Sequence, residues 1–236
     1  MKNIGLMPGK ITVPESRTLE EFLKLRYIEE SPAWEYINGE AIQKPMGGAK
    51  HSLLQKRLVA VIDGLGSNYE AFPELRCTCG NRSVVPDVVV ISTNQLPLDE
   101  SGEIISSGID FAPAWVIEIL SPAQSQTKVT GNILHCLKNG SQLGWLIDPS
   151  ERCILVYQPN SLPDLLAGKD ILPVLEDLNL TLSVDEVFFC LVTSEKLIQQ
   201  NSEFRSQNSE VKQALYLALR RIVVYFNKLK SAVLFL

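Results

Sequence analysis

The sequence predicts an α/β fold, or an α+β fold, in which a mixed β-sheet is flanked by helices. Short runs rich in β-branched and aromatic residues recur between residues 72 and 158. One connection between such runs, residues 124–140, has apolar residues three and four positions apart and ends at Gly140, as an amphipathic helix does. This strand–helix–strand order implies a crossover, so part of the sheet is expected to be parallel.

The N-terminal part is expected to contain two helices and a hairpin. Residues 18–30 carry an apolar stripe that begins with a capping box, Thr18 with Glu21 three positions later. Asn38-Gly39 lies between two apolar-rich segments and tolerates positive φ at both turn positions, so it predicts a two-residue hairpin turn. Residues 49–66 repeat apolar positions at helical spacing and predict a second helix.

The strand-like runs and their turns complete a first domain, residues 1–190. These runs occupy residues 72–80, 83–92, 113–120, 142–149 and 152–158. The last two are joined by Asp148-Pro149-Ser150-Glu151, a composition that favours a tight turn.

Residues 191–236 are expected to form a C-terminal helical extension. From Phe204 to Leu229 the apolar residues are mostly three and four positions apart. Lysines and arginines interrupt this pattern too often for a membrane span. We expect the helix to dock on the domain or to pair with a second copy in a homodimer. Contact with a membrane surface is an alternative, because the polar face is basic.

Composition limits the classes of protein. With 236 residues, 45% apolar and 21% charged, the chain does not look disordered or collagen-like. Its five scattered cysteines and the absence of a signal-like apolar start favour a cytoplasmic protein. The net charge of −5 argues against a nucleic-acid partner overall. Residues 204–236, which are strongly basic, leave room for a local positive face.

Two carboxylates stand out by their position. Asp87 opens a β-branched run after a proline, and Glu118 lies inside an apolar run. A carboxylate buried without a partner is costly, so Glu118 needs a base or a metal ion. With a main-chain carbonyl such as that of Ile119, the two acids would suit Mg²⁺ or Mn²⁺, and such an ion activates water for attack on a phosphodiester. The alternative is that Asp87 caps a turn and Glu118 pairs with a basic residue of a helix.

These residues resemble the PD-(D/E)XK restriction-endonuclease-like superfamily and, more narrowly, a restriction-endonuclease family abundant in cyanobacteria. The matching segments span roughly residues 15–190: they are Asn38-Gly39-Glu40, His51, 82–90, 116–122 and 135–149. The resemblance implies a mixed sheet flanked by helices and Mg²⁺-dependent cleavage of DNA, with Asp87 and Glu118 as metal ligands.

The chain departs from that pattern at the lysine. The superfamily places a lysine two residues after the second acid, where this chain has Leu120. The narrower family takes its lysine from the following helix, at the position of Asn132. Lys128 lies one helical turn earlier on a similar face, so we expect it to supply the catalytic cation. The alternative is a catalytically degenerate nuclease fold that binds nucleic acid or a protein partner.

Four further residues are candidates for supporting roles. Glu40 could be a third carboxylate near the metal or a solvated strand acid. His51 could bind a substrate phosphate or assist proton transfer, or it could only belong to a capping turn. Arg82 is a candidate phosphate contact or a member of an ion pair. Gln124 borders the expected substrate site and could equally cap the helix.

Other chemistries have weaker support. Cys77 and Cys79 alternate on a strand-like run, and His135 with Cys136 could complete a zinc site, but the usual two-residue spacing is missing. Neither a phosphate-binding glycine loop nor a GxSxG turn is present in the sequence. A third reading is an interaction module that dimerises through its C-terminal helix.

Overall fold

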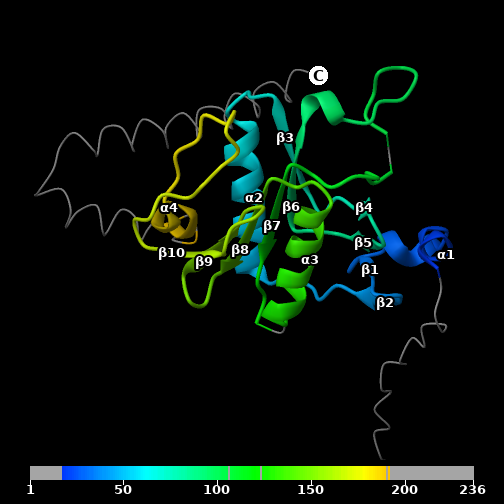
Figure 1. Cartoon of the computed structure of the whole chain (residues 1–236), viewed down its shortest axis with the longest axis horizontal. Helices are drawn as coiled ribbons and strands as arrows, with labels where there is room; N and C mark the ends of the chain where they lie inside the picture. The colour runs from blue at the N-terminus through cyan, green and yellow to red at the C-terminus, as the bar shows by residue number, and fades with distance from the viewer. Residues whose placement is uncertain (1–17, 106, 123, 190, 192–236) are drawn as a thin grey trace, which may run out of the picture. The chain divides into compact units, whose positions relative to one another are not determined.

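The computed structural model describes residues 18–105, 107–122, 124–189 and 191. The predicted C-terminal helix lies outside these residues, as does the proposed role of that helix in a homodimer. The described chain forms two β-sheets with helices packed against them (Figure 1). In this part of the chain, no helix has both the length and the apolar character that crossing a membrane requires.

The larger sheet has six strands in the order β10-β9-β8-β7-β6-β3. Their bounds are β3 Tyr69–Pro73, β6 Val88–Ser92, β7 Trp115–Ile119, β8 Leu143–Asp148, β9 Cys153–Tyr157 and β10 Asp164–Ala167. The pair β7–β8 is parallel and the others are antiparallel. Helix α3, Gln126–Lys138, connects the parallel pair. The mixed sheet and the crossover helix predicted from the sequence are therefore confirmed.

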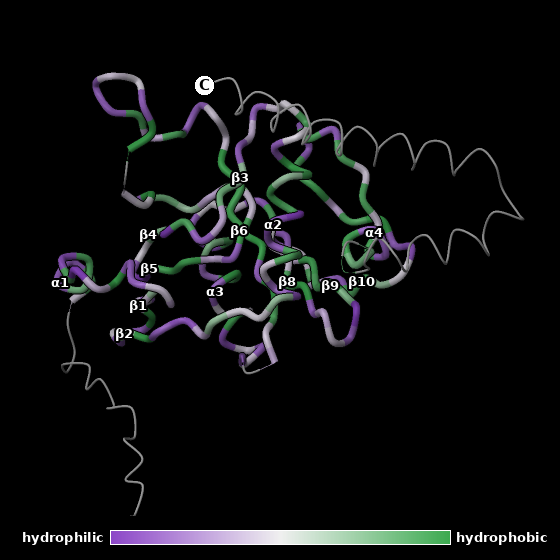
Figure 2. The backbone as a smooth tube through the Cα atoms, turned by 180° about the vertical axis from the view of Figure 1, so that it is seen from behind, coloured by the Kyte–Doolittle hydropathy of each residue, from purple (hydrophilic) through white to green (hydrophobic). Residues whose placement is uncertain are grey.

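Helices cover both faces of the larger sheet. Helix α2, Ala49–Asp63, packs on one face and α3 on the other (Figure 1). Alternate residues of β6 and β7 divide between the two: Val88 and Ile117 face α2, whereas Val89 and Val116 face α3. Short helix α4, Val184–Phe189, joins the α2 side. The central strands are consequently mostly hydrophobic (Figure 2).

The smaller sheet has four strands in the order β2-β1-β5-β4. They are β1 Trp34–Ile37, β2 Glu40–Gln43, β4 Cys77–Cys79 and β5 Arg82–Val84. The predicted hairpin is present, with Asn38 at φ 54° and Gly39 at φ 89°. Positive φ at both positions is typical of the two-residue turn whose twist matches the strands. This turn fixes the register of the hairpin, with Ile37 opposite Glu40.

The helix predicted over residues 18–30 is divided in two. The capping box of Thr18 and Glu21 starts α1, Leu19–Leu23, as expected. The chain then leaves the helix and forms a 3-10 turn, Arg26–Glu29. This break allows the Tyr27 ring to meet the edge of Trp34 on β1, with 5.7 Å between ring centroids. Packing against the small sheet therefore overrides the helical pattern.

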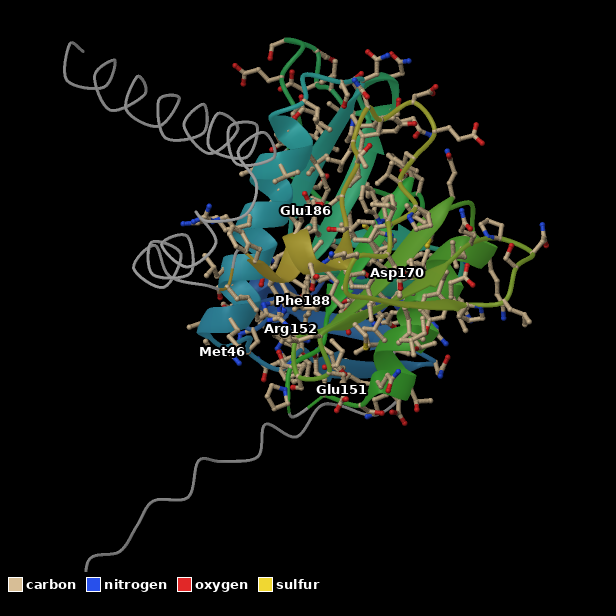
Figure 3. All side chains as sticks on the ribbon, turned by 90° about the vertical axis from the view of Figure 1, so that its left-hand side faces the viewer. Met46, Glu151, Arg152, Asp170, Glu186 and Phe188 are labelled. Carbon is tan, nitrogen blue, oxygen red and sulfur yellow. The ribbon has the colours of Figure 1, made fainter. Side chains whose placement is uncertain are left out.

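The predicted turn between β8 and β9 is also present. The Asp148 side chain accepts hydrogen bonds from the main-chain N–H groups of Ser150 and Glu151, at 2.8 and 3.1 Å. Arg152, the next residue, has its guanidinium 5.1 Å from the centre of the Phe188 ring on α4 (Figure 3). The turn thereby ties the end of the sheet to α4.

Candidate functional site

Asp87 and Glu118 lie beside each other on adjacent strands of the larger sheet. β6 and β7 are antiparallel with Val88 opposite Ile117, and continuing this register by one residue sets Asp87 opposite Glu118. Glu118 alternates with Ile117 and Ile119 along β7 and therefore turns toward the α3 face, whereas Asp87 lies in the bend just before β6. Both carboxylates are buried. The main-chain N–H of Ile119 donates to Asp87 Oδ2 at 2.6 Å. The two acids are therefore held in one buried place.

A lysine from the small sheet stands between these acids. Lys44 directly follows β2 and is buried. Its Nζ donates to Asp87 Oδ1 at 2.5 Å and to the carbonyl oxygen of Val85 at 2.6 Å. The same Nζ is 3.8 Å from Glu118 Oε2. One ammonium group is thus shared between the two carboxylates.

A third buried carboxylate, Glu35 on β1, belongs to the same cluster. Its Oε1 accepts a hydrogen bond from the main-chain N–H of Val85 at 2.9 Å. Glu35 and Lys44 consequently hold the two main-chain polar groups of Val85, two residues before Asp87. The hairpin thereby fixes the segment that leads into β6.

Helix α2 approaches Asp87 from the other side. His51 Nε2 lies 2.9 Å from Asp87 Oδ2, and the His51 side chain is buried. One turn later, Gln55 Nε2 donates to the main-chain oxygen of Asp87 at 2.8 Å. Both oxygens of the Asp87 carboxylate therefore have nitrogen partners, and its orientation is fixed.

Charge in the cluster is unbalanced. Burial raises the pKa of Glu118 well above its ordinary value, and burial likewise raises the pKa of Glu35, although Lys44 opposes both effects. Burial alone would raise the pKa of Asp87, but Lys44 and His51 outweigh it and keep that pKa low. Burial would lower the pKa of Lys44, yet the three acids raise it. Three buried carboxylates thus face one fixed ammonium group.

Asn132 of helix α3 also belongs to this cluster. It is buried, and its side chain is hydrogen-bonded to Glu35. Its Oδ1 has no hydrogen-bond partner within the described residues. Leaving a buried amide oxygen without a partner costs free energy, so packing alone does not explain why position 132 carries a polar side chain.

Two of the expected site residues lie away from this cluster. Glu40 is exposed on β2, and the hairpin turns Glu35 into the cluster in its place. Lys128 is exposed in the first turn of α3, whereas the cation beside Asp87 and Glu118 is Lys44. The difference arises because the small sheet packs over the ends of β6 and β7 and brings its own charges there.

Arg82 and Gln124 are engaged in local structure. Arg82 donates from Nη1 to the carbonyl oxygen of Gly131 at 3.1 Å and from Nη2 to Asn38 Oδ1 at 2.8 Å. It therefore links the hairpin turn to α3. Gln124 Oε1 accepts the main-chain N–H of Ser121 at 2.9 Å in the turn before α3. The partners of Arg82 are neutral groups and not the acid of an ion pair, and Gln124 closes the turn without capping α3.

The sequence contained a signal for Glu35 and Lys44. A two-residue turn at Asn38-Gly39 pairs Glu35 with Ile42. Opposite residues share a face, and so do residues two apart in one strand, so Glu35, Ile42 and Lys44 all point the same way. An acid and a lysine on the same face of a hairpin form a candidate pair that inspection of single motifs does not reveal.

The donor set suits a hard divalent cation. Carboxylate oxygens are the ligands such ions prefer, and the excess of buried negative charge favours one. Among the described residues, no three His, Cys, Asp or Glu side chains are already grouped as a metal site. A metal site at Asp87, Glu118 and the main-chain carbonyl of Ile119 therefore stays a prediction. The same observation gives no support to a zinc site at Cys77, Cys79 and Cys136, which are buried free thiols.

This fold and this cluster define a class. A mixed sheet with an acid after a proline and a second acid on the neighbouring strand resembles the restriction-endonuclease-like arrangement. The chain belongs to the Uma2 family, described as "Putative restriction endonuclease", whose family model matches residues 19–185. The resemblance drawn from the motifs is thereby confirmed.

A solved structure is similar over most of the chain. It is the crystal structure of a "putative nuclease belonging to DUF820" from Anabaena variabilis, which is 48% identical in sequence. The match covers 75% of this chain and 99% of that chain, with a TM-score of 0.71. A comparison with curated proteins finds no match.

Proposed function

We propose that this protein is a metal-dependent DNA endonuclease. The observation that carries the proposal is the buried cluster in which three carboxylates face one ammonium group at the ends of β6 and β7. Asp87 and Glu118 would hold Mg²⁺ or Mn²⁺ together with the main-chain carbonyl of Ile119. A bound ion of this kind supplies an activated water and neutralises charge on the phosphate.

The residues around the acids prepare them for this role. His51 and the N–H of Ile119 fix Asp87 Oδ2, so that carboxylate does not need to reorganise when a ligand arrives. The strands that carry both acids are buried on both faces, which holds their spacing rigid. In the reaction, a water would lose one proton as its oxygen bonds to phosphorus, the bond from phosphorus to the leaving sugar oxygen would break, and that oxygen would take up one proton.

The test is cleavage of supercoiled and linear DNA with Mg²⁺ and with Mn²⁺. Wild type is compared with Asp87→Asn, Glu118→Gln and a matched control, Glu70→Gln, which changes an exposed acid of β3. We expect wild type and Glu70→Gln to cleave equally and the two site variants to lose at least about 100-fold in rate. Cleavage that persists in both site variants would contradict the proposed site.

A second candidate is a nuclease fold that binds nucleic acid without cutting it. Asn132, at the position where the family resemblance implies a lysine, favours this reading. Absence of cleavage by wild type, together with retarded migration of the same DNA, would support it over the endonuclease.

A further inference from the structure

The positions where a nuclease lysine is expected cannot supply a cation in this chain. Leu120 is partly buried and packs against the apolar cluster on the α3 side. Asn132 is buried and neutral, with its side chain hydrogen-bonded to Glu35. Lys128 is exposed on the surface of α3. A positive charge beside the two acids must come from another element.

Lys44 meets the geometric requirement. Its Nζ contacts both acids, at 2.5 Å from Asp87 Oδ1 and 3.8 Å from Glu118 Oε2. Two of its three N–H groups are used by Asp87 and Val85, and the distance to Glu118 is within ion-pair range but beyond a hydrogen bond. The ammonium is therefore anchored on one side and open toward Glu118.

The hairpin fixes the position of Lys44. The Asn38-Gly39 turn sets the register, and the main-chain N–H of Lys44 donates to Ala33 at 2.8 Å, one step beyond the last strand pair. The Arg82 side chain holds the turn against α3. Lys44 is thus delivered by a rigid element of the small sheet and not by a flexible surface side chain.

We propose that Lys44, supplied by the N-terminal hairpin, is the catalytic lysine of this nuclease site. Lys44 thereby replaces the lysine that the family resemblance implies on helix α3, where this chain has Asn132. This inference rests on the proposed function. A fixed positive charge beside the two carboxylates favours the phosphodiester transition state, which carries more negative charge than the substrate. A second lysine at 132 would place two ammonium groups in the same buried cluster.

A charge-exchange experiment tests the assignment. The variants are Lys44→Met, Lys44→Arg, Asn132→Lys and the double variant Lys44→Met with Asn132→Lys. Lys169→Met, an exposed lysine after β10, is the matched control. Cleavage of supercoiled DNA is measured with Mn²⁺, and Mn²⁺ affinity is measured separately by calorimetry.

We expect Lys44→Met to lose at least about 100-fold in cleavage while binding Mn²⁺ as tightly as wild type or more tightly, because the competing ammonium is gone. The double variant is expected to recover at least about tenfold over Lys44→Met, since it restores one cation to the cluster. Lys44→Arg keeps the charge but changes its shape, so it should fold and retain only part of the rate.

Two results would overturn the role of Lys44. One is Lys44→Met cleaving within about threefold of wild type while Asp87→Asn is inactive, which leaves the endonuclease standing. The other is a double variant that folds, as judged by its melting temperature, yet recovers nothing. Absence of cleavage by wild type would overturn the endonuclease and this role together. If Lys44→Met does not fold, the double variant and Lys44→Arg decide the question.

Discussion

The two sheets contribute to the acid cluster in different ways. The larger sheet provides Glu118 from β7 and Asp87 from the bend before β6, and the residues of both strands are mostly apolar and packed on both faces. The smaller sheet provides Glu35 and Lys44 from a hairpin whose second strand is largely exposed. Core packing therefore positions the acids, whereas the register of a turn positions the cation. The cluster depends on the contact between a rigid scaffold and a small appended sheet.

Arg76 is a buried residue that ties the small sheet to the 3-10 turn before it. Arg76 donates to Glu29 Oε1 at 2.5 Å, to Ser83 Oγ at 3.0 Å and to the carbonyl oxygen of Ile28 at 2.8 Å. Arg76→Ala leaves the buried Ile28 carbonyl oxygen without this donor and removes a hydrogen bond to the buried Ser83, so it should lower the free energy of unfolding by about 3 kcal/mol. Urea unfolding measures this loss. Arg26→Ala, at an exposed site, should change stability by less than about 0.5 kcal/mol. Equal effects of the two variants would refute this role of Arg76.

The larger sheet can be disturbed at Gly144 on β8. A Cβ at this position would lie 2.3 Å from Cγ2 of Ile133 on α3, so Gly144→Ala must push the helix away from the sheet. We expect a loss of about 2 kcal/mol in the free energy of unfolding. In an Ile133→Ala background the same substitution should cost at least about 1 kcal/mol less, because the obstructing methyl is absent. Additive losses in the double variant would show that the close contact is not the cause.

The pH dependence of the free energy of unfolding tests the unbalanced charge of the buried cluster, to which both sheets contribute. Because the pKa of Glu118 is raised from 4.5, the folded protein holds a proton there that the unfolded chain releases as pH rises. Stability therefore falls as pH rises from about 4.5 toward the folded pKa. Glu118→Gln removes this loss and should be more stable than wild type at pH 7 with chelator, on the order of 1 kcal/mol. Unfolding at pH 5 and at pH 7 measures the difference, which must grow with pH.

The smallest expected effect concerns the helix that touches Asp87. A Cβ on Gly47 would lie 2.4 Å from Nδ1 of His51, whereas a Cβ on Gly48 would meet nothing within 4 Å. Gly47→Ala should cost less than about 1 kcal/mol and shift the NMR signals of the His51 ring. Gly48→Ala should leave those signals in place. Identical spectra for the two variants would mean that the ring adjusts without moving from Asp87.

The sequence by itself determined the elements and the two acids. Helical spacing gave α2 and α3, the Asn38-Gly39 pair gave the hairpin, and acids inside apolar runs marked Asp87 and Glu118, because these signals depend on neighbours within a few residues. The break in the helix at 18–30 was missed, since packing of Tyr27 on the small sheet decides it.

Tertiary structure alone decided which charges meet. Glu40 and Lys128 fit the motifs as well as Glu35 and Lys44 do, but the first pair is exposed and the second is buried beside Asp87. The hairpin register shows that Glu35 and Lys44 lie on the same face of the hairpin. It does not show that this face lies against Val85 and the ends of β6 and β7. That contact joins segments more than 40 residues apart in sequence, and the packing of two sheets creates it.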